Sequence, residues 1–367
     1  MEDKKKLIII GGSVVGLIVV ILLITFLISI FKPKYYTYEE FEDKIVEATK
    51  EYYKLNPTML PVSDGEHHLS YSTLVSAQMI KPIEEMLKTG VSCTVDILVT
   101  KYGDNYSYIP YLSCPGEYET KELYKAILEN NPVVTTGKGL YKENEEHVFK
   151  GEVENNYLKF DEDDDDYWKI VKVNPDNTIK IIQLEQTISD TFTWDDRYNE
   201  ERESNYGYND FELSRMKDTL LKISSSETVL SDTDKNKLVA KNWCIGKRSE
   251  TETDKTGAVE CSVMSEDNIL FGLLTVSEII NASLDPNCVN SVSTSCINYN
   301  FITKNKTSTW TLTGATEKSY RVYYYNFAGP KASSAYTERK LILATNISNR
   351  AFYKSGNGTY EDPYIVR

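Results

Sequence analysis

Histidine is scarce in this chain, which has only three: His67, His68 and His147. The adjacent pair cannot face one way on a regular helix or strand, and no Cys or acidic residue recurs around it at ligand spacing. The chain also lacks G-x-S-x-G, H-E-x-x-H and P-loop sequences, and no G-x-G-x-x-G follows a strand. These absences argue against a zinc site and against the common hydrolase, metalloprotease and nucleotide-binding classes. We therefore expect no catalytic residue, no cofactor and no enzymatic activity.

Basic residues are outnumbered, because 41 Lys and Arg stand against 55 Asp and Glu, for a formal net charge of −14. Nucleic-acid binding needs a basic surface, so we expect no nucleic-acid partner. The most acidic stretch, residues 161–166, offers Asp161, Asp163 and Asp165 as weak candidates for calcium ligands. A calcium loop of the EF-hand type has Gly at position six and Glu at position twelve, where this chain has Asp166 and Lys172. The run therefore predicts a solvated hairpin tip, and we expect no metal.

No two cysteines have C-x-x-C spacing, which argues against a zinc ribbon or a thioredoxin-type motif. The cysteines at 93 and 114 lie symmetrically about Gly103 and Asp104 in a predicted hairpin, so we expect them to pair. The same mirror argument pairs those at 244 and 261, and those at 288 and 296 close a short loop. The disulfide residues are thus Cys93, Cys114, Cys244, Cys261, Cys288 and Cys296. Disulfides indicate folding outside the cytoplasm, whereas six buried free thiols are the alternative.

Charge is absent from residues 7–31, an apolar run of twenty-five residues. At about 1.5 Å per helical residue, the run can cross a hydrocarbon core of about 30 Å. A cleavable signal peptide has a shorter apolar region and a core helix has a polar side, so we favour an uncleaved transmembrane helix over both. Three lysines at positions 4–6 precede the run and two follow it. With the cysteine placement, this bias predicts a single-pass protein of the cell membrane, with residues 1–6 in the cytoplasm and the C-terminal domain extracellular.

The remaining chain is predicted to be α+β, because helices and strands do not alternate regularly. Residues 35–130 are predicted to form a membrane-proximal helical stalk with a small disulfide-closed β-hairpin domain, including a helix that Thr37 and Glu40 begin as a capping box. Residues 131–140 are predicted to be a linker, and residues 141–367 a larger α+β domain. Helices are expected there at 209–223 and 231–241, and after a capping box at Thr275 and Glu278. Strands are expected at 147–150, 157–160, 167–173, 178–184, 310–313, 320–325, 341–344 and 364–366.

The second half resembles a family of single-pass surface proteins of Firmicutes. The segments that carry the resemblance are GEVENNY (151–157), YWKI (167–170), WDDRYN (194–199), WCIGKR (243–248), GLL (272–274), NASLD (281–285), WTLT (310–313) and GNGTYEDPY (356–364). The last, G-x-G-T-x-x-D-P-Y, is the most specific. The resemblance implies an extracellular domain related to the C-type-lectin-like and formylglycine-generating-enzyme-like folds. Lectins of that fold bind calcium with an E-P-N-type triplet followed by W-N-D, but here the similar triplets at 285–287 and 194–196 stand in the opposite order.

The N-terminal part is similar to type IV pilin-like proteins, in which a hydrophobic helix continues into a stalk. It departs from them because no G-F-T-L-x-E processing site precedes the apolar run. A retained anchor is therefore a better interpretation than a cleaved, polymerising subunit.

The sequence leaves several functions open. We expect a membrane-anchored surface protein that binds an extracellular ligand, either a glycan or a protein, and mediates adhesion without catalysis. A pilus-like or envelope-scaffold component is the first alternative, and an envelope enzyme is the second. The twenty-seven tyrosines fit a recognition surface or, equally, packing between strands.

Overall fold

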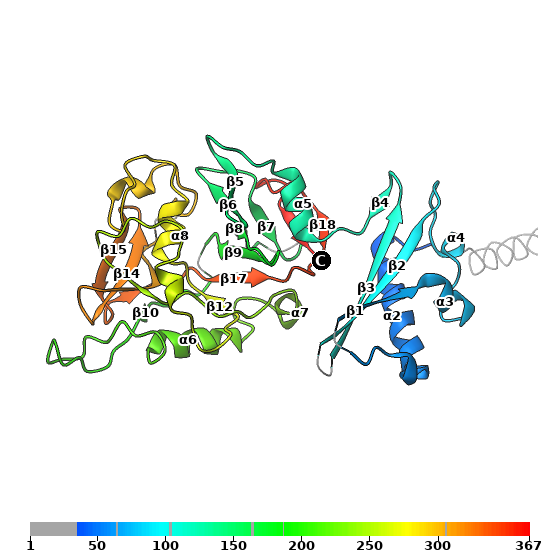
Figure 1. Cartoon of the computed structure of the whole chain (residues 1–367), viewed down its shortest axis with the longest axis horizontal. Helices are drawn as coiled ribbons and strands as arrows, with labels where there is room; N and C mark the ends of the chain where they lie inside the picture. Colours follow the sequence, from blue (N-terminus) through cyan, green and yellow to red (C-terminus); the bar gives the residue numbers. More distant parts are fainter. Residues whose placement is uncertain (1–34, 64, 103–104, 163–164, 186, 305–306) are drawn as a thin grey trace, which may run out of the picture. The chain divides into compact units, whose positions relative to one another are not determined.

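The computed structural model describes residues 35–63, 65–102, 105–162, 165–185, 187–304 and 307–367 (Figure 1). The chain divides into two compact units, Met1–Thr120 and Lys121–Arg367. Each unit has a hydrophobic core of its own. The fold is mixed α+β, with more residues in strands than in helices.

The N-terminal unit consists of one long helix and an antiparallel sheet in the order β1-β2-β3-β4. Helix α2 (Tyr38–Leu55) begins at the expected capping box: the Thr37 hydroxyl accepts the N–H of Glu40, and the Glu40 carboxylate accepts the N–H of Thr37. The other elements are the 3₁₀ helix η1 (Pro57–Met59), β1 (Gly65–Ser70), α3 (Tyr71–Ser76), α4 (Ile83–Met86), β2 (Thr94–Tyr102), β3 (Asn105–Cys114) and β4 (Tyr118–Glu119).

The prediction of a helical stalk is wrong. Phe41 and Ile45 on α2 are fully buried and belong to one core with Ile97 of β2 and Leu112 of β3. The helix packs on β3 along its apolar stripe and the sheet covers it, so it does not extend from the unit as a stalk. The helix is therefore one layer of a small globular unit.

The membrane-spanning part of the fold prediction finds no support in the described residues. Within the described ranges, no helix is both long enough and apolar enough to cross a bilayer. The predicted span, residues 7–31, lies outside the described residues.

The distal unit is built on a nine-stranded sheet in the order β12-β17-β9-β8-β7-β19-β18, with β6 also pairing with β8 and β5 pairing with β6. Its ladders are antiparallel except that of β19 with β7, which is parallel. The C-terminal strand β19 thus lies between β7 and the edge strand β18. The strands are β5 (Gly139–Glu143), β6 (Glu146–Lys150), β7 (Tyr157–Lys159), β8 (Trp168–Val173), β9 (Ile179–Gln183), β12 (Phe271–Gly272), β17 (Ala344–Ile347), β18 (Tyr353–Ser355) and β19 (Tyr364–Val366).

A four-stranded sheet, β11-β13-β14-β15, and a two-stranded ladder, β10-β16, complete the strands of this unit in the described ranges. The remaining elements are α5 (Leu123–Asn130), β10 (Phe192–Thr193), α6 (Arg215–Ser224), α7 (Asp232–Lys235), β11 (Lys247–Arg248), η2 (Glu260–Ser262), α8 (Val276–Asn281), η3 (Thr294–Ile297), β13 (Thr309–Ala315), β14 (Arg321–Asn326), β15 (Gly329–Ser334) and β16 (Glu338–Arg339).

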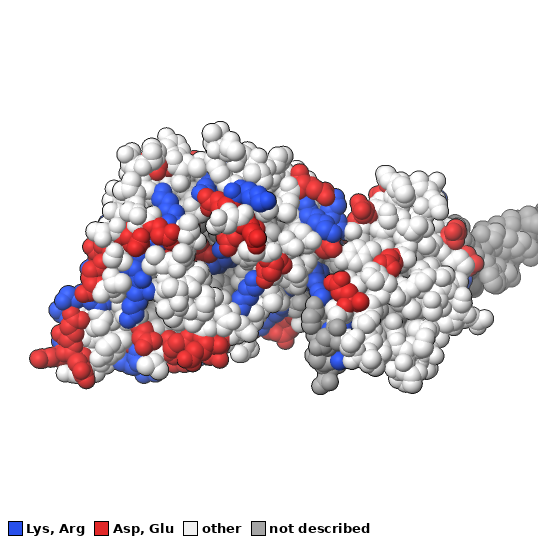
Figure 2. Space-filling view, in the orientation of Figure 1, with Lys and Arg blue, Asp and Glu red and all other residues white. Residues whose placement is uncertain are grey.

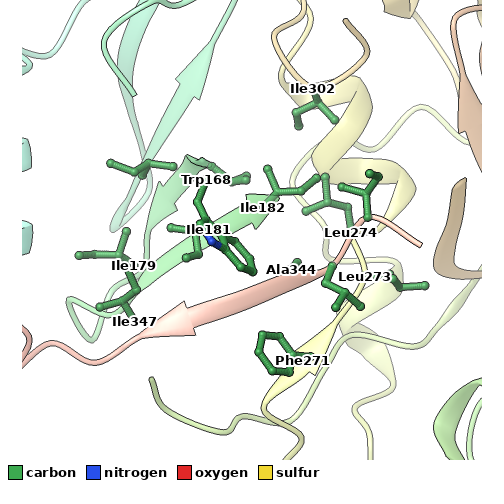
Figure 3. Packing of buried hydrophobic residues seen from close by; sticks show 14 of the residues in the cluster. Trp168, Ile179, Ile181, Ile182, Phe271, Leu273, Leu274, Ile302, Ala344 and Ile347 are labelled. Atoms are coloured by element: carbon green, nitrogen blue, oxygen red, sulfur yellow. The ribbon is translucent and has the colours of Figure 1, made fainter. Parts of the chain in front are cut away.

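The core of the distal unit joins segments that are distant in the sequence. In Figure 3, the Trp168 side chain of β8 lies among Ile181 of β9 and Ala344 of β17, with Phe271 and Leu273 of the β12 region below and beside them. All five residues are almost completely buried. This core holds β7, β8 and β9 in place, and these three strands carry the candidate site described below.

Two predicted helices are shorter than expected because local groups bond elsewhere. The Asn209 side chain donates to the carbonyls of Ala315, Lys318 and Arg321, so the chain is not helical there, and Ser214 caps α6 instead. The predicted helix at 231–241 ends early because Val239 donates its N–H to the carbonyl of Asn346 in β17.

The boundary between the units falls at Thr120/Lys121, whereas the sequence places a linker at 131–140. Helix α5 belongs with the distal unit because Leu123 and Ile127 are fully buried in its core. The N–H of Leu123 also donates to the carbonyl of Ala351.

The six cysteines form three disulfides. The pairs are Cys93–Cys114, Cys244–Cys261 and Cys288–Cys296, as the spacing predicts. Three disulfides indicate that the chain folds in an extracellular or otherwise oxidising compartment.

Candidate functional site

Three neighbouring strands bring together the side chains of the candidate site. Tyr157 of β7 is the direct cross-strand partner of Lys169 on β8, and Lys169 in turn is the partner of Ile182 on β9. Direct partners in an antiparallel ladder lie on the same face of the sheet. The row therefore places one lysine between an aromatic and an aliphatic side chain.

This row forms the floor of a cavity of about 620 Å³, which we call the lysine pocket. Three lysines and one acidic residue line it, together with aromatic and aliphatic side chains. The lining residues are Tyr157, Lys169, Ile182, Gln183, Leu184, Glu185, Phe301, Ile302, Lys304, Thr307, Tyr325, Lys340 and Ile342. The pocket thus has basic groups within an apolar wall, in a protein that is acidic as a whole.

Lys169 is the unusual group of the pocket. It is only 4% exposed, and no carboxylate of the described chain forms an ion pair with its ammonium. The Nζ atom instead lies 4.3 Å from the ring centroid of Tyr157 and 5.6 Å from that of Phe301. Burial, together with the positive charge of Lys304, lowers the pKa of Lys169 to about 8, against a small opposing effect of Glu154.

The other two lysines are exposed at the mouth of the pocket. Lys304 forms an ion pair with Glu152 at 3.4 Å, and both side chains are about half exposed, so the pair is weak. Glu185 is the acidic lining residue. On the face shown in Figure 2, acidic and basic side chains are interspersed over the distal unit. Three lysines against one glutamate give the lining of this pocket a net positive charge.

A cluster of three tyrosines borders the lysine pocket. The Tyr360 ring stacks on that of Tyr167 with centroids 4.6 Å apart, and it meets Tyr157 edge-on at 5.4 Å. Tyr360 is half exposed. We call these three side chains the tyrosine ledge. Aromatic side chains of this kind offer flat apolar contact area together with a polar hydroxyl.

The specific motif G-x-G-T-x-x-D-P-Y positions the ledge. Gly356 and Gly358 both have positive φ, 93° and 86°. A Cβ on Gly356 would lie 1.8 Å from the Pro363 carbonyl oxygen, so only glycine fits there. The Gly358 carbonyl accepts the N–H of Tyr157 at 2.7 Å, which ties the loop that carries Tyr360 to β7.

A smaller hollow of about 160 Å³ lies beyond the ledge. It shares Gln183, Leu184 and Glu185 with the lysine pocket, and its other lining residues include Asp165 and Tyr360. The two hollows are therefore adjacent, the first rich in lysine and the second acidic.

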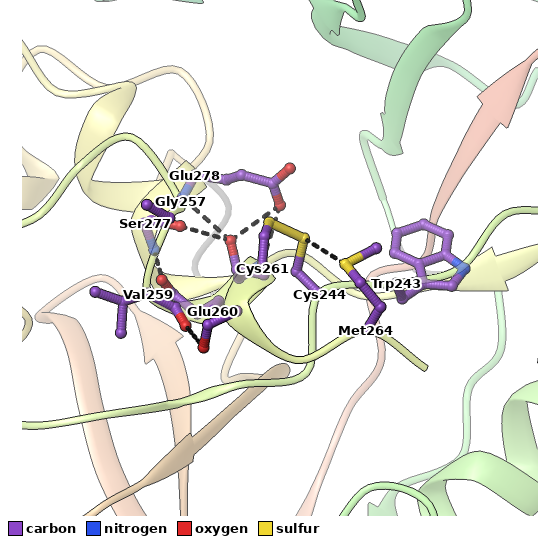
Figure 4. The surroundings of a disulfide bond; sticks show 12 residues. Trp243, Cys244, Gly257, Val259, Glu260, Cys261, Met264, Ser277 and Glu278 are labelled. Carbon is purple, nitrogen blue, oxygen red and sulfur yellow. Dashed lines mark hydrogen bonds between the residues drawn. A yellow bond between two sulfur atoms is a disulfide. The ribbon is translucent and has the colours of Figure 1, made fainter. Parts of the chain in front are cut away.

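A second polar cavity, of about 230 Å³, lies beside the Cys244–Cys261 disulfide. Figure 4 shows Trp243, Met264 and Glu278 around this disulfide. Here, in contrast to Lys169, the buried Lys180 has a carboxylate partner, since its Nζ lies 2.5 Å from Glu278. Burial lowers the pKa of Lys180. For Glu278, burial alone would raise the pKa, but the neighbouring Lys180 and Lys172 outweigh it and the pKa is lowered. Lys180 and Glu278 therefore compensate each other's charge, and this buried lysine does not require a ligand as its partner.

The structure does not gather the residues that the sequence offered as metal ligands. Asp161 and Asp165 are exposed, and Asp163 lies outside the described residues. His68 bonds to Asp96 at 2.6 Å in the N-terminal unit, whereas His147 lies on β6. Across the described ranges, no three His, Cys, Asp or Glu side chains converge as metal ligands.

The two lectin-like triplets use their carboxylates internally. Asp195 is completely buried and accepts from Arg197 at 2.8 Å and from the N–H of Tyr208 at 2.7 Å. Asp285 accepts from the Asn298 amide at 2.6 Å. Neither carboxylate is presented to a ligand as in a calcium-dependent lectin.

Sequence reasoning missed the lysine pocket. The available signal was a lysine inside the strand sequence WKIVKV, whose other positions are mainly apolar. A strand buried on both faces rarely has an unpaired charge, so Lys169 required either a partner or a function. The sequence could not show which, because the other lining residues lie up to about 170 positions away.

Comparison of the chain with known families, with curated proteins and with solved structures gives no match.

Proposed function

We propose that this protein is a non-catalytic binding protein of an extracytoplasmic compartment, whose distal unit binds an anionic ligand in the lysine pocket. The observation that carries the proposal is the buried Lys169, whose ammonium has no carboxylate partner among the described residues. An unpaired buried charge is costly and is retained where it is used. A carboxylate or phosphate group of a ligand would supply the missing partner.

The surroundings of Lys169 favour a ligand with an anionic group on a ring-shaped body. Lys304 and Lys340 at the pocket mouth add positive charge next to the buried ammonium. Tyr157 and Tyr360 offer aromatic faces and edges at the border, where a sugar or another ring can pack. An acidic saccharide is therefore the ligand class that we favour over a protein.

Binding can be tested with residues 35–367, which contain every residue of the hydrophobic cores. The probes are glycans with carboxylate or phosphate groups and their neutral counterparts, each measured with and without a chelator. We expect the fragment to bind the anionic probes, with affinity that falls as salt rises and does not change with the chelator.

Two variants make this experiment specific. Lys169→Gln should abolish binding of the anionic probes, whereas Lys331→Gln, which removes an exposed lysine of β15 outside the pocket, should leave it unchanged. Equal binding of neutral and anionic probes, or full binding by Lys169→Gln, would contradict the proposal. If no probe binds and the chain forms oligomers, an envelope-scaffold role becomes the better explanation.

We also propose that the protein is attached to the outer face of a cell membrane. The disulfides indicate an oxidising compartment, and the uncharged residues 7–31 are the reason to place the chain at the outer face of a cell membrane. The relation to single-pass surface proteins of Firmicutes likewise rests on the sequence segments alone. Recovery of the full chain in the soluble fraction after alkaline washing of membranes would contradict membrane attachment.

A further inference from the structure

A lysine, an asparagine and a glutamate form a closed triangle of hydrogen bonds in the distal unit. Lys150 at the end of β6 donates from Nζ to the Asn281 Oδ1 atom at 2.8 Å, and it also donates to the Glu143 carboxylate of β5. The other oxygen of Glu143 accepts from Asn281 Nδ2 at 2.7 Å. A single carboxylate therefore contacts both the amine and the amide nitrogen.

The backbone on both sides of the triangle is fixed. Gly151, next to Lys150, donates its N–H to the carbonyl of Ala282, next to Asn281, at 2.8 Å. Gly151 has a φ of 85°, and a Cβ there would lie 2.6 Å from the Leu284 side chain, so the two segments approach as closely as glycine allows. The amine and the amide are thus held together by the fold, which is the condition under which proximity accelerates a reaction.

The Lys150 side chain is largely shielded from water. It is 13% exposed, and its Nζ lies 5.4 Å from the ring centroid of Tyr141 on β5. A second lysine, Lys255, lies nearby. Burial lowers the pKa of Lys255, and the positive charge of Lys150 lowers it further. The Lys150 amine therefore lies in a largely buried position beside a second lysine.

From this geometry, we propose that Lys150 and Asn281 form an intramolecular amide cross-link with Glu143 as the proton-transfer group. Glu143 takes a proton from the Lys150 ammonium, and the neutral amine attacks Cγ of Asn281. The new Nζ–Cγ bond forms, Nζ loses its second proton, and the Cγ–Nδ2 bond breaks. The two protons that Nζ has lost pass through Glu143 to Nδ2, which leaves as an ammonium ion. The products are an amide and an ammonium ion, and no oxidant or cofactor is needed. The bond would join β6 to α8 across 131 residues of sequence.

The test is the mass of the full chain, purified in folded, oxidised form and then denatured for mass spectrometry. With its three disulfides intact, the cross-linked chain is lighter by one molecule of ammonia than the chain without the cross-link. Peptide mapping locates the loss: trypsin should fail to cleave after Lys150, and a branched peptide should join Lys150 to Asn281. The same chain unfolded and reduced directly after synthesis should show no loss of ammonia until it folds.

Variants separate the cross-link from a simple polar contact. Glu143→Gln and Lys150→Arg should both have the mass calculated from their own sequences with three disulfides, without loss of ammonia. Lys172→Arg is the matched control, because Lys172 also bonds to a glutamate on the neighbouring strand, and it should still lose one ammonia. The wild-type map does not depend on whether a variant folds. A full wild-type mass, or a loss that maps to a succinimide at another asparagine such as Asn357, would overturn the proposal.

Discussion

Replacing Lys169 by Met tests the central observation of the lysine pocket without any ligand. Methionine has a similar length and no charge, so it fills the space between Tyr157 and Phe301 while removing the buried ammonium. If the ammonium is as costly as its surroundings indicate, the variant must be more stable than the wild-type protein. A gain in stability on losing a charged residue is the reverse of what removal of a structural lysine would do.

The size and the pH dependence of the gain follow from the pKa of Lys169, which burial lowers from 10.5 to about 8. One pKa unit corresponds to about 1.4 kcal/mol, so burying the ammonium costs about 3 kcal/mol at pH 7. Loss of the cation–π contact with Tyr157 offsets about 1 kcal/mol, which leaves a net gain of about 2 kcal/mol. Between pH 8 and 10.5 the unfolded chain holds a proton that the folded chain has released, so wild-type stability rises with pH. The advantage of the variant is therefore largest below pH 8 and is lost as the pH approaches 10.5.

The assay is urea unfolding followed by tryptophan fluorescence at several pH values between 6 and 10. All four tryptophans lie in the distal unit, so the signal reports on the unit that contains the pocket. Lys340→Met is the control, because this exposed lysine of the same pocket should change stability by less than about 0.5 kcal/mol at every pH. A destabilised Lys169→Met variant, or a gain that does not vary with pH, would refute the reasoning.

Three further predictions concern the framework around the site. Gly358→Ala should destabilise the distal unit by about 2 kcal/mol or more, because the φ of Gly358 is 86° and a Cβ would lie 2.4 Å from the ring of the buried Tyr364. Tryptophan-monitored unfolding measures this, and an unchanged midpoint would contradict it. Glu278→Gln should lower the free energy of unfolding by about 3–5 kcal/mol, because it leaves Lys180 buried without a countercharge. In the same assay, the double variant Glu278→Gln/Lys180→Met should recover much of that loss. The double variant Cys93→Ala/Cys114→Ala should lower the stability of the N-terminal unit by about 3 kcal/mol, followed by tyrosine fluorescence, with no change in the tryptophan midpoint.

Local signals in the sequence were sufficient where a structural feature depends on neighbouring residues. The capping boxes at Thr37 and Thr275 begin α2 and α8 as expected, because their hydrogen bonds lie within one helical turn. The β8–β9 hairpin turns at Asn177, whose φ is 63°, within the sequence N-P-D-N (174–177), whose residue types favour turns. The three disulfides likewise join cysteines that are close in sequence, so that mirror symmetry of a hairpin or a short loop could pair them.

Features that depend on distant segments could not be predicted in the same way. The apolar stripe of α2 is visible in the sequence, but the sheet that covers it is formed by strands some fifty residues later, so a stalk and a packed layer look alike. Asn209 has a favourable helical context, yet three carbonyls from residues 315–321 draw it out of α6. In both cases tertiary contacts override a local preference.

The acidic run and the buried lysine show how the strongest sequence signal and the strongest structural signal can differ. Six consecutive acidic residues attract attention, but the described ones lie exposed near a hairpin end, where water compensates their charge. Lys169 is a single letter in an apolar strand, and its significance depends on the cost of burying one charge in a cavity without a carboxylate partner. The motif G-x-G-T-x-x-D-P-Y connects the two levels, because its glycines fix the loop that holds Tyr360 against Tyr157, and Tyr157 in turn contacts the Lys169 ammonium. A motif with no catalytic residue can therefore still bear on ligand binding, since it determines the wall of the pocket in which the lysine lies.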